Sequence, residues 1–422
     1  MTLKDVLTNF EKEKAPGVRL KEALKSYDYV LALVTIGLGV FGVVMIYTFV
    51  HGSGALSAAR AMTHIVGRQQ MYIISGAVLM IIFSAIDYHI LTRFFIFVYG
   101  FMLVLLFVVM FIGVTEGTGV ARWVWIPIPG FGPISMQPSE FAKLFMILFL
   151  AKYLSVINDR FNHVLWLGLT LVLIVVPVVF VMRQPSLSAS LVILFVSLTM
   201  LFVGGLYYRT ILIGSVLLTP AVVMVWFDIR REDPLFLLSL IGRFQWDRIQ
   251  IWRNPIPGHP LFHQTEGSLR AIGNGGLTGT GFMNTTHVIH GHNDFVFSLV
   301  SEQFGFLGAT VLLLVTAFLI FKCIFISLRA IDMEGRLIAA GVSGMLIFET
   351  FVHVGVATNL LPNTGMPFPF VSYGGSMIWV HMMAIGVVLN VGLPRTKNTM
   401  FGEDDDSFKP GKKKDYVKGW SA

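Results

Sequence analysis

The chain has 422 residues, of which 55% are hydrophobic and only 13% are charged. An average soluble domain carries about 25% charged residues, so this composition excludes a water-soluble protein. The net charge of +7 does not indicate a nucleic-acid partner, because the basic residues flank apolar runs, as the positive-inside bias of membrane proteins predicts. The single cysteine, Cys323, excludes an intramolecular disulfide and a cysteine-based metal site.

Apolar runs of membrane-spanning length follow one another along the chain. A hydrocarbon core about 30 Å thick needs about 20 apolar residues in a helix. We therefore predict an all-α integral membrane protein of about ten transmembrane helices. In chain order they are expected near residues 28–49, 71–87, 92–114, 138–155, 163–182, 187–205, 209–227, 295–323, 336–358 and 376–394. The run 295–323 is longer than needed, so we expect it to be tilted or to begin outside the membrane.

Lysine and arginine near the span ends predict the orientation. They collect on the face that holds both termini, so the N-terminal segment 1–27 and the basic tail 395–422 are expected in the cytoplasm. Flanking charge explains the tail, with contact to anionic membrane lipids as the alternative. Between these ends lies one polytopic domain, 28–394, with a large extracytoplasmic loop, 228–294, between the seventh and eighth spans. Because so long a connection is usually functional or disordered, and this one is rich in tryptophan and glycine, we expect function on the outer face.

Polar residues gather around the start of the fourth predicted span. They are Arg122, Trp123, Gln137, Ser139, Glu140 and Lys143. A carboxylate and an ammonium three positions apart lie on one face of a helix. Charges at the head of a span are costly unless paired or functional. Glu140 and Lys143 are therefore either a structural clamp or part of a polar cavity that opens outward.

Two further polar segments lie at predicted span ends. In the turn after the fifth span, Arg183 and its neighbour Gln184 offer either a cation for a diphosphate or an interfacial anchor. Before the eighth span, a glycine string leads to Asp294 and then to Glu302. Acidic groups at the head of a span need a reason, so we expect an electrostatic or cation-binding role. If the site uses a divalent cation, Mg²⁺ or Mn²⁺, Asp294 is the first candidate ligand.

The segment 359–376 reads as a re-entrant or rim segment. Its prolines break helix, its glycines let the backbone approach a ligand, and its hydroxyls can satisfy freed backbone groups. Its backbone amides are suited to a phosphate. The candidate binding residues are Thr364, Ser372, Tyr373, Gly374 and Gly375.

Taken in order, these segments resemble the signatures of the SEDS family (RodA, FtsW, SpoVE). This chain reads RW from Arg122, QPSEFAK from Gln137, AIGNGGL from Ala271, HNDFVF from His292 with Glu302 following, and PNTGMPFPFVSYGGS from Pro362. These strings resemble the family's RW, QPSE-x-x-K, AIGSGGL, HTDFIF and PxTGxxLPFxSYGGS. The turn QPSLS from Gln184 resembles the family's QPDLG, with Ser186 in place of the usual aspartate and Ser188 in place of the usual glycine. The resemblance implies a peptidoglycan glycosyltransferase of the bacterial cytoplasmic membrane, acting in elongation, division or sporulation. It also implies lipid II, a disaccharide-peptide on undecaprenyl diphosphate, as substrate and a class B penicillin-binding transpeptidase as partner.

A second stretch also departs from the family pattern. The resemblance implies an essential aspartate within residues 254–264, where this chain has no carboxylate. Three explanations stay open. His259 acts as the base; a loop carboxylate reaches in, with Asp233, Asp247 and Glu266 as candidates; or the chain is a scaffold that binds lipid precursor or a partner without polymerising.

The candidate catalytic residues are therefore His259, Asp294 and Glu302. A flippase or transporter of lipid-linked precursors is the alternative from another class. Against it, the two halves show no internal repeat, and the polar residues crowd at the outer rim.

Overall fold

The computed structural model describes residues 25–52, 63–113, 122–128, 132–184, 186–231, 241–285 and 291–394. The predicted cytoplasmic segments 1–27 and 395–422 lie almost wholly outside these residues. All the elements below belong to one unit, Ser26–Leu393.

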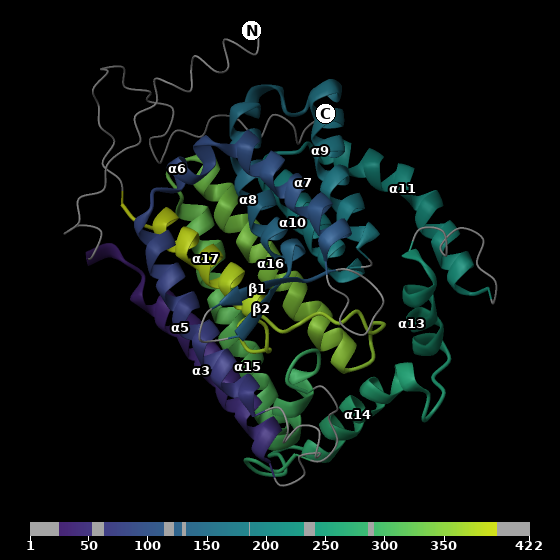
Figure 1. The fold of residues 1–422 in the computed structure, drawn as a ribbon. Helices are drawn as coiled ribbons and strands as arrows, with labels where there is room; N and C mark the ends of the chain where they lie inside the picture. Colours follow the sequence, from purple (N-terminus) through teal and green to yellow (C-terminus); the bar gives the residue numbers. More distant parts are fainter. Residues whose placement is uncertain are drawn as a thin grey trace. The chain divides into compact units, whose positions relative to one another are not determined.

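Within the described ranges, ten helices occupy the ten predicted spans (Figure 1). They are α3 (Tyr29–His51), α5 (His64–Ala85), α7 (Phe95–Ile112), α8 (Pro138–Val156), α9 (Val164–Arg183), α10 (Leu187–Val203), α11 (Tyr208–Ile229), α15 (Val296–Arg329), α16 (Met333–Ala357) and α17 (Gly375–Val391). Seven of these are long and apolar enough to cross a membrane, and α10 and α17 are apolar but shorter. The prediction of an all-α, multi-pass membrane protein is confirmed, while the number of spans stays a prediction.

Shorter elements connect these helices. They are α6 (Tyr88–Arg93), the one-turn η1 (Asn158–Arg160), α13 (Arg243–Arg253) and α14 (Pro260–Gly275). Strands β1 (Val124–Ile128) and β2 (Gly132–Met136) pair antiparallel, with Val124 opposite Met136. The sequence analysis expected no strand there, and the hairpin leads the chain directly into α8.

Several helix starts follow from local chemistry. Pro138 occupies the first turn of α8, where its missing N–H costs nothing. The side chain of Asp28 accepts a hydrogen bond from the amide of Leu31 at the start of α3. Asp332 caps α16 in the same way through the amide of Gly335. Polar residues at the span ends therefore fix where these apolar helices begin.

The long eighth run is not one continuous helix. Gly305 inside α15 has φ +65°, so the backbone breaks there and separates a short first helix from the long remainder. A Cβ atom at Gly305 would lie 2.4 Å from the amide nitrogen of Gly279. One at Gly279 would lie 2.1 Å from the carbonyl oxygen of Gln303. The glycine string thus packs its own backbone against the start of α15, a contact that side chains would prevent.

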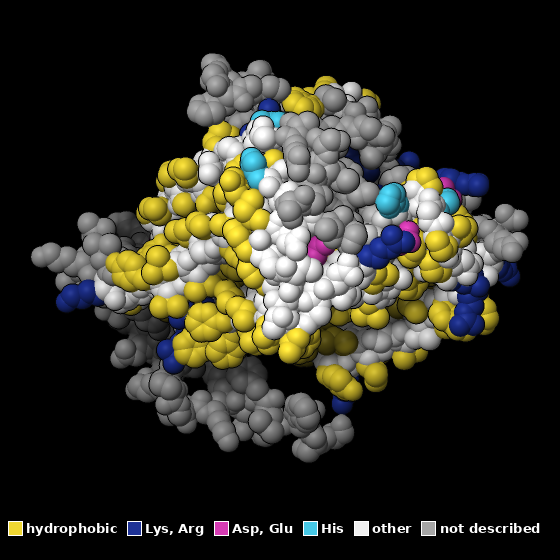
Figure 2. All heavy atoms as spheres, turned by 90° about the horizontal axis from the view of Figure 1, so that it is seen from below, with side chains coloured by type: hydrophobic (Ala, Val, Ile, Leu, Met, Phe, Trp, Pro, Cys, Tyr) yellow, Lys and Arg dark blue, Asp and Glu magenta, His cyan; other side chains and the backbone are white. Residues whose placement is uncertain are grey.

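The helices differ strongly in burial. Almost every residue of α17 is buried, and α17 packs against α5 and α16, while α16 also packs against α8, α10 and α15. On α11, by contrast, Asp228 is the one described residue that is buried. Figure 2 shows apolar side chains mainly around the edge of the face seen from below, with backbone and uncharged polar atoms toward its middle and few acidic side chains in view. Apolar surface on this scale suits hydrocarbon better than water. The functional site, by contrast, is built against the buried helices α8, α16 and α17.

Candidate active site

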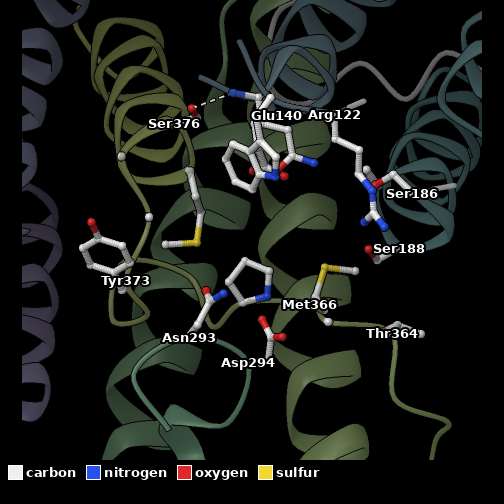
Figure 3. Close-up of a pocket in the computed structure, with 18 of the residues that line it drawn as sticks. Arg122, Glu140, Ser186, Ser188, Asn293, Asp294, Thr364, Met366, Tyr373 and Ser376 are labelled. Atoms are coloured by element: carbon white, nitrogen blue, oxygen red, sulfur yellow. Dashed lines mark hydrogen bonds between the residues drawn. The ribbon is translucent and has the colours of Figure 1, made fainter. Parts of the chain in front are cut away.

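A cavity of about 220 Å³ lies where the motif segments of the sequence meet. It is bordered by the residues before β1, the starts of α8, α10 and α17, helix α13 and the turn before α15 (Figure 3). Nine of the predicted site residues line it: Arg122, Trp123, Gln137, Glu140, Asp294, Thr364, Tyr373, Gly374 and Gly375. Segments separated by more than 200 residues in the sequence therefore form one site.

Two guanidinium groups and two carboxylates line this cavity. Arg122 and Asp294 point into the space from opposite sides, and Arg248 of α13 also lines it (Figure 3). Burial lowers the pKa of Arg122, and the nearby Asp294 carboxylate opposes that effect. Burial also lowers the pKa of Arg248, where Asp294 opposes the shift and Arg122 adds to it. Arg122 and Arg248 are thus two cations beside one anion, Asp294, while the Glu140 carboxylate is paired with Lys143.

Asp294 is held in place by the segment that precedes α17. The hydroxyl of Ser372 donates to the carbonyl oxygen of Asn293 at 2.6 Å, and the amide of Tyr373 donates to the carbonyl of His292 at 2.8 Å. Gln69 of α5 fixes the segment from the other side, because its Nε2 donates to the carbonyl of Ser372 at 3.1 Å. Ser372 itself is fully buried and lies outside the lining residues. Ser372 therefore supports the wall of the cavity without lining it.

Helix α13 is hydrogen-bonded to the segment that precedes α17. Nη1 of Arg248 donates to the carbonyl of Asn363 at 2.9 Å, and Nε1 of Trp252 donates to the carbonyl of Asn359 at 3.0 Å. Sequence reasoning missed Arg248, because an arginine on a short helix of mixed polarity has the pattern of a surface residue. It also missed four polar lining residues: Ser186, Ser188, Asn293 and Ser376.

Glu140 joins the cavity to a buried cluster of charges. Nζ of Lys143 lies 2.6 Å from Oε2 of Glu140 and 2.6 Å from Oε1 of Glu349 on α16. His381 of α17 lies behind, with Nε2 2.5 Å from Oε2 of Glu349. Glu140 lines the cavity while Lys143 does not, so the two alternatives for this pair hold together. Glu349 and His381 were missed, although an ionisable residue inside an apolar run is itself a signal of function.

The other predicted binding residues lie outside the cavity lining. Ser139 is buried and accepts a hydrogen bond from Nε2 of Gln137 at 3.0 Å. Gln184 is buried at the end of α9, where its Nε2 donates to the carbonyl of Leu106 at 2.9 Å. Arg183 occupies the last turn of α9. Their predicted contact with substrate stays untested, and Gln184 visibly ties α9 to α7.

His259 and Glu302 are also placed away from the lining. His259 precedes α14, where its Nδ1 accepts a hydrogen bond from the amide of Leu261 at 3.3 Å. Glu302 is fully buried in the first part of α15. The structure therefore brings one of the three catalytic candidates, Asp294, to the cavity. A base role for His259 stays an untested prediction.

The loop carboxylates named as alternatives are paired where they are described. Asp247 lies 3.7 Å from Nε of Arg243, and Oε1 of Glu266 accepts from Nη2 of Arg270 at 2.6 Å. Asp233 falls outside the described residues. Of the carboxylates that the structure describes, Asp294 and Glu140 line the cavity.

The residues present do not make a metal cage by themselves. In the described part of the chain, no three His, Cys, Asp or Glu residues are grouped to hold a metal ion. Mg²⁺, however, is commonly bound by one or two carboxylates together with substrate phosphates. Asp294 at the wall of a cavity of about 220 Å³ fits that kind of site.

The fold and the cavity together define a class: a polytopic membrane protein whose polar residues converge on a charged cavity at one end of its helices. The chain belongs to the FtsW, RodA and SpoVE family, described as cell cycle proteins, whose model matches residues 28–397. The predicted family is thereby confirmed. The protein is a multi-pass protein of the cytoplasmic membrane.

Individual relatives span most of the chain. A probable peptidoglycan glycosyltransferase FtsW of Geobacter metallireducens is 31% identical over 392 residues, which cover 90% of this chain and 98% of the relative. The stage V sporulation protein E of Bacillus subtilis is 33% identical over 305 residues, covering 69% of this chain and 77% of that protein.

Solved structures show the same fold. A chain of a peptidoglycan synthase complex, described for its coordination of polymerization and crosslinking, superimposes with a TM-score of 0.70 at 27% identity and covers 87% of this chain and 97% of its own length. The rod shape determining protein RodA of Thermus thermophilus superimposes with a TM-score of 0.61 at 26% identity, covering 88% of this chain and 98% of its own.

Proposed function

We propose that this protein is a peptidoglycan glycosyltransferase that extends glycan strands from lipid II in the described cavity, on the outer face of the membrane. The single observation that carries the proposal is the convergence of Arg122, Arg248 and Asp294 on one space. Transfer of a sugar from a lipid diphosphate needs positive charge for the departing diphosphate and a base for the acceptor hydroxyl. The names of the relatives agree with this reaction.

In this proposal the arginines bind the diphosphate. Guanidinium groups match phosphate oxygens in a planar, two-point geometry. Nε of Arg122 and Oγ1 of Thr364 are buried and have no hydrogen-bond partner among the described residues. Buried polar atoms are normally bonded, so these two atoms support a polar ligand in the cavity.

Asp294 is the proposed base. The bond between the anomeric carbon and the diphosphate oxygen breaks while the acceptor hydroxyl oxygen bonds to that carbon, and the hydroxyl proton passes to Asp294. Before substrate binds, Arg122 and Arg248 interact electrostatically with Asp294. A bound diphosphate would compete for these two cations, which leaves the Asp294 carboxylate available to accept the hydroxyl proton.

Glu140 is the proposed acceptor of hydrogen bonds from the sugar. It lines the cavity and its carboxylate is held by Lys143 at 2.6 Å. A divalent cation, if the reaction uses one, would be held by Asp294 together with the diphosphate, and it would supply further positive charge for the leaving group. A class B penicillin-binding transpeptidase is the proposed partner, since one structural neighbour belongs to a complex that both polymerises and crosslinks.

The test is polymerisation of labelled lipid II by the purified protein, alone and with its cognate transpeptidase, beside an Arg122→Ala variant. We expect glycan ladders from the wild type and their loss in the variant. Ladders of equal intensity from both proteins would overturn the assignment of the cavity. Bound lipid II without any ladder would instead support a scaffold, the alternative that the missing carboxylate in residues 254–264 favours.

A further inference from the structure

The cluster behind Glu140 contains more buried charge than one clamp requires. Glu349 and Lys143 each expose 1% of their surface, His381 exposes none and Glu140 exposes 7%. Three helices supply the four residues: α8, α16 and α17. Burial of charge is costly unless every member is paired, so the hydrogen bonds of the cluster decide how many protons it holds.

The two contacts of the His381 ring show how many protons the cluster holds. Its Nδ1 lies 2.6 Å from the carbonyl oxygen of Met377, and its Nε2 lies 2.5 Å from Oε2 of Glu349. A carbonyl oxygen only accepts, so Nδ1 carries a hydrogen. At Nε2 the proton belongs either to an imidazolium facing a carboxylate or to a protonated Glu349 facing a neutral ring. In both cases the pair holds one proton more than a neutral histidine beside a carboxylate.

This extra proton balances the cluster. Glu140 and Glu349 are two potential anions, whereas Lys143 is one cation that touches both. Without the extra proton the buried group would carry a net negative charge, and with it the net charge is zero. The balance leaves Lys143 able to hold Glu140 as a charged carboxylate at the cavity wall.

The other elements packed against α17 bring no further charged group to the ring of His381 in the contacts of the described residues. Helix α5 carries the buried Tyr72, and the ring of Phe370 lies 5.3 Å from that of His381. Lys322 of α15 pairs with Asp28 at 2.6 Å. The count of charges therefore rests on the four cluster residues.

A second buried histidine shows the contrasting case. His353 on α16 is also fully buried, and its Nδ1 lies 2.8 Å from the carbonyl oxygen of Met366. Its Nε2 accepts a hydrogen bond from the amide of Phe297 at 3.3 Å. One nitrogen donates and the other accepts, so His353 is a neutral ring and provides a matched control.

We propose that His381 is a positioning residue of the catalytic cavity: by sharing a proton with Glu349, it leaves Lys143 to keep Glu140 charged toward the substrate. The inference rests on the proposed function for its kinetic readout. It goes beyond that function because it assigns the role to a residue that lies outside the cavity.

The kinetic test is the pH profile of lipid II polymerisation for the wild type and for His381→Gln, which cannot hold the extra proton. One carboxylate of the cluster then lacks a compensating positive charge, so the acidic limb should move to higher pH. The double variant with Glu349→Gln restores the charge balance and should return the limb to its wild-type position. His353→Asn should leave the limb in place.

An unmoved limb in His381→Gln, or a double variant shifted as far as the single one, would overturn the proposal. Infrared difference spectroscopy gives a second readout that needs no turnover, because protonated carboxyl groups absorb apart from carboxylates. We expect a protonated-carboxyl band in His381→Gln near neutral pH that is absent from the double variant, and a band of equal intensity in the two variants would contradict the proposal. If the wild type fails to polymerise lipid II, the proposed function falls, while the infrared result still tests His381.

Discussion

The charged residues of this membrane protein form two groups with different surroundings. In the cavity, Arg122 and Arg248 lie near Asp294, and these side chains border a space of about 220 Å³ that Glu140 also lines. At the opposite end of the helices, His89 lies 2.9 Å from Asp87 and 2.8 Å from Asp332. We call these three residues the His89 cluster. No member of it lines that cavity.

The neighbours of the His89 cluster are bonded in the same mutual way. The hydroxyl of Tyr88 donates to Asp332 at 2.8 Å, and Lys152 lies 3.0 Å from Glu334, which also accepts from Thr92. Here the charged side chains are paired with one another. Their ion pairs and hydrogen bonds connect α6, α8 and the start of α16. The comparison teaches that a charge near a span end is not by itself a sign of function. The side chains with a ligand-sized space before them are the ones to test.

The largest effect is expected at Asp294. Replacing it with asparagine keeps the shape but removes the proposed base, so polymerisation should fall on the order of 10² to 10⁴-fold. The measurement is the initial rate of lipid II polymerisation with saturating substrate. Asp247→Asn is the matched control, since Asp247 pairs with Arg243 away from the cavity. A rate near that of the control would remove Asp294 from the catalytic group.

Arg248 comes next. Arg248→Ala should lower the polymerisation rate on the order of 10² to 10³-fold, because it removes a cation that stabilises the departing diphosphate. Arg243 lies on the same helix but exposes 82% of its side chain, so Arg243→Ala should stay close to wild type. Equal polymerisation rates for the two variants would show that Arg248 contributes no more to the reaction than a surface arginine does.

The His89 cluster should affect stability and its pH dependence. Burial alone would lower the pKa of His89, but hydrogen bonds to Asp332 and Asp87 outweigh it and raise that pKa from 6.5 to about 9. Burial alone would raise the pKa of Asp332, but its bonds, chiefly to His89, lower it from 3.8 to about 2.

The sign for each group follows from these shifts. The contribution of His89 is complete below about pH 6.5 and is lost as the pH rises through about 9. That of Asp332 is complete above about pH 3.8 and is lost as the pH falls through about 2. Thermal unfolding of wild type and His89→Gln should therefore differ by about 1 kcal/mol at pH 6, allowing for solvent screening, and converge by pH 10. A difference that persists at pH 10 would mean that packing, not charge, stabilises this end.

The smallest effect is expected at His259. It caps α14 through a single hydrogen bond outside the cavity lining, so His259→Ala should change the free energy of unfolding by less than about 1 kcal/mol. Polymerisation should stay within about threefold of wild type, as for most substitutions away from a site. A loss comparable to that of the Asp294 variant would show instead that His259 is the base.

The sequence predicted the helices well because each apolar run must satisfy its own backbone hydrogen bonds in a membrane. The start of α8 at Pro138 was read correctly for the same local reason. Two features of the fold were not predicted. The hairpin β1–β2 and the break at Gly305 depend on contacts with distant parts of the chain, such as the approach of Gly279.

The candidate site divides in the same way. The class of protein and nine of the residues that line the cavity could be predicted from the sequence, because polar side chains at span ends and helix-breaking segments are visible as local patterns. The tertiary structure alone decided that Arg248 faces Asp294, that Glu349 and His381 stand behind Glu140, and that His259 lies elsewhere. Those are distances between residues far apart in the chain, and the packing of α13, α16 and α17 sets them.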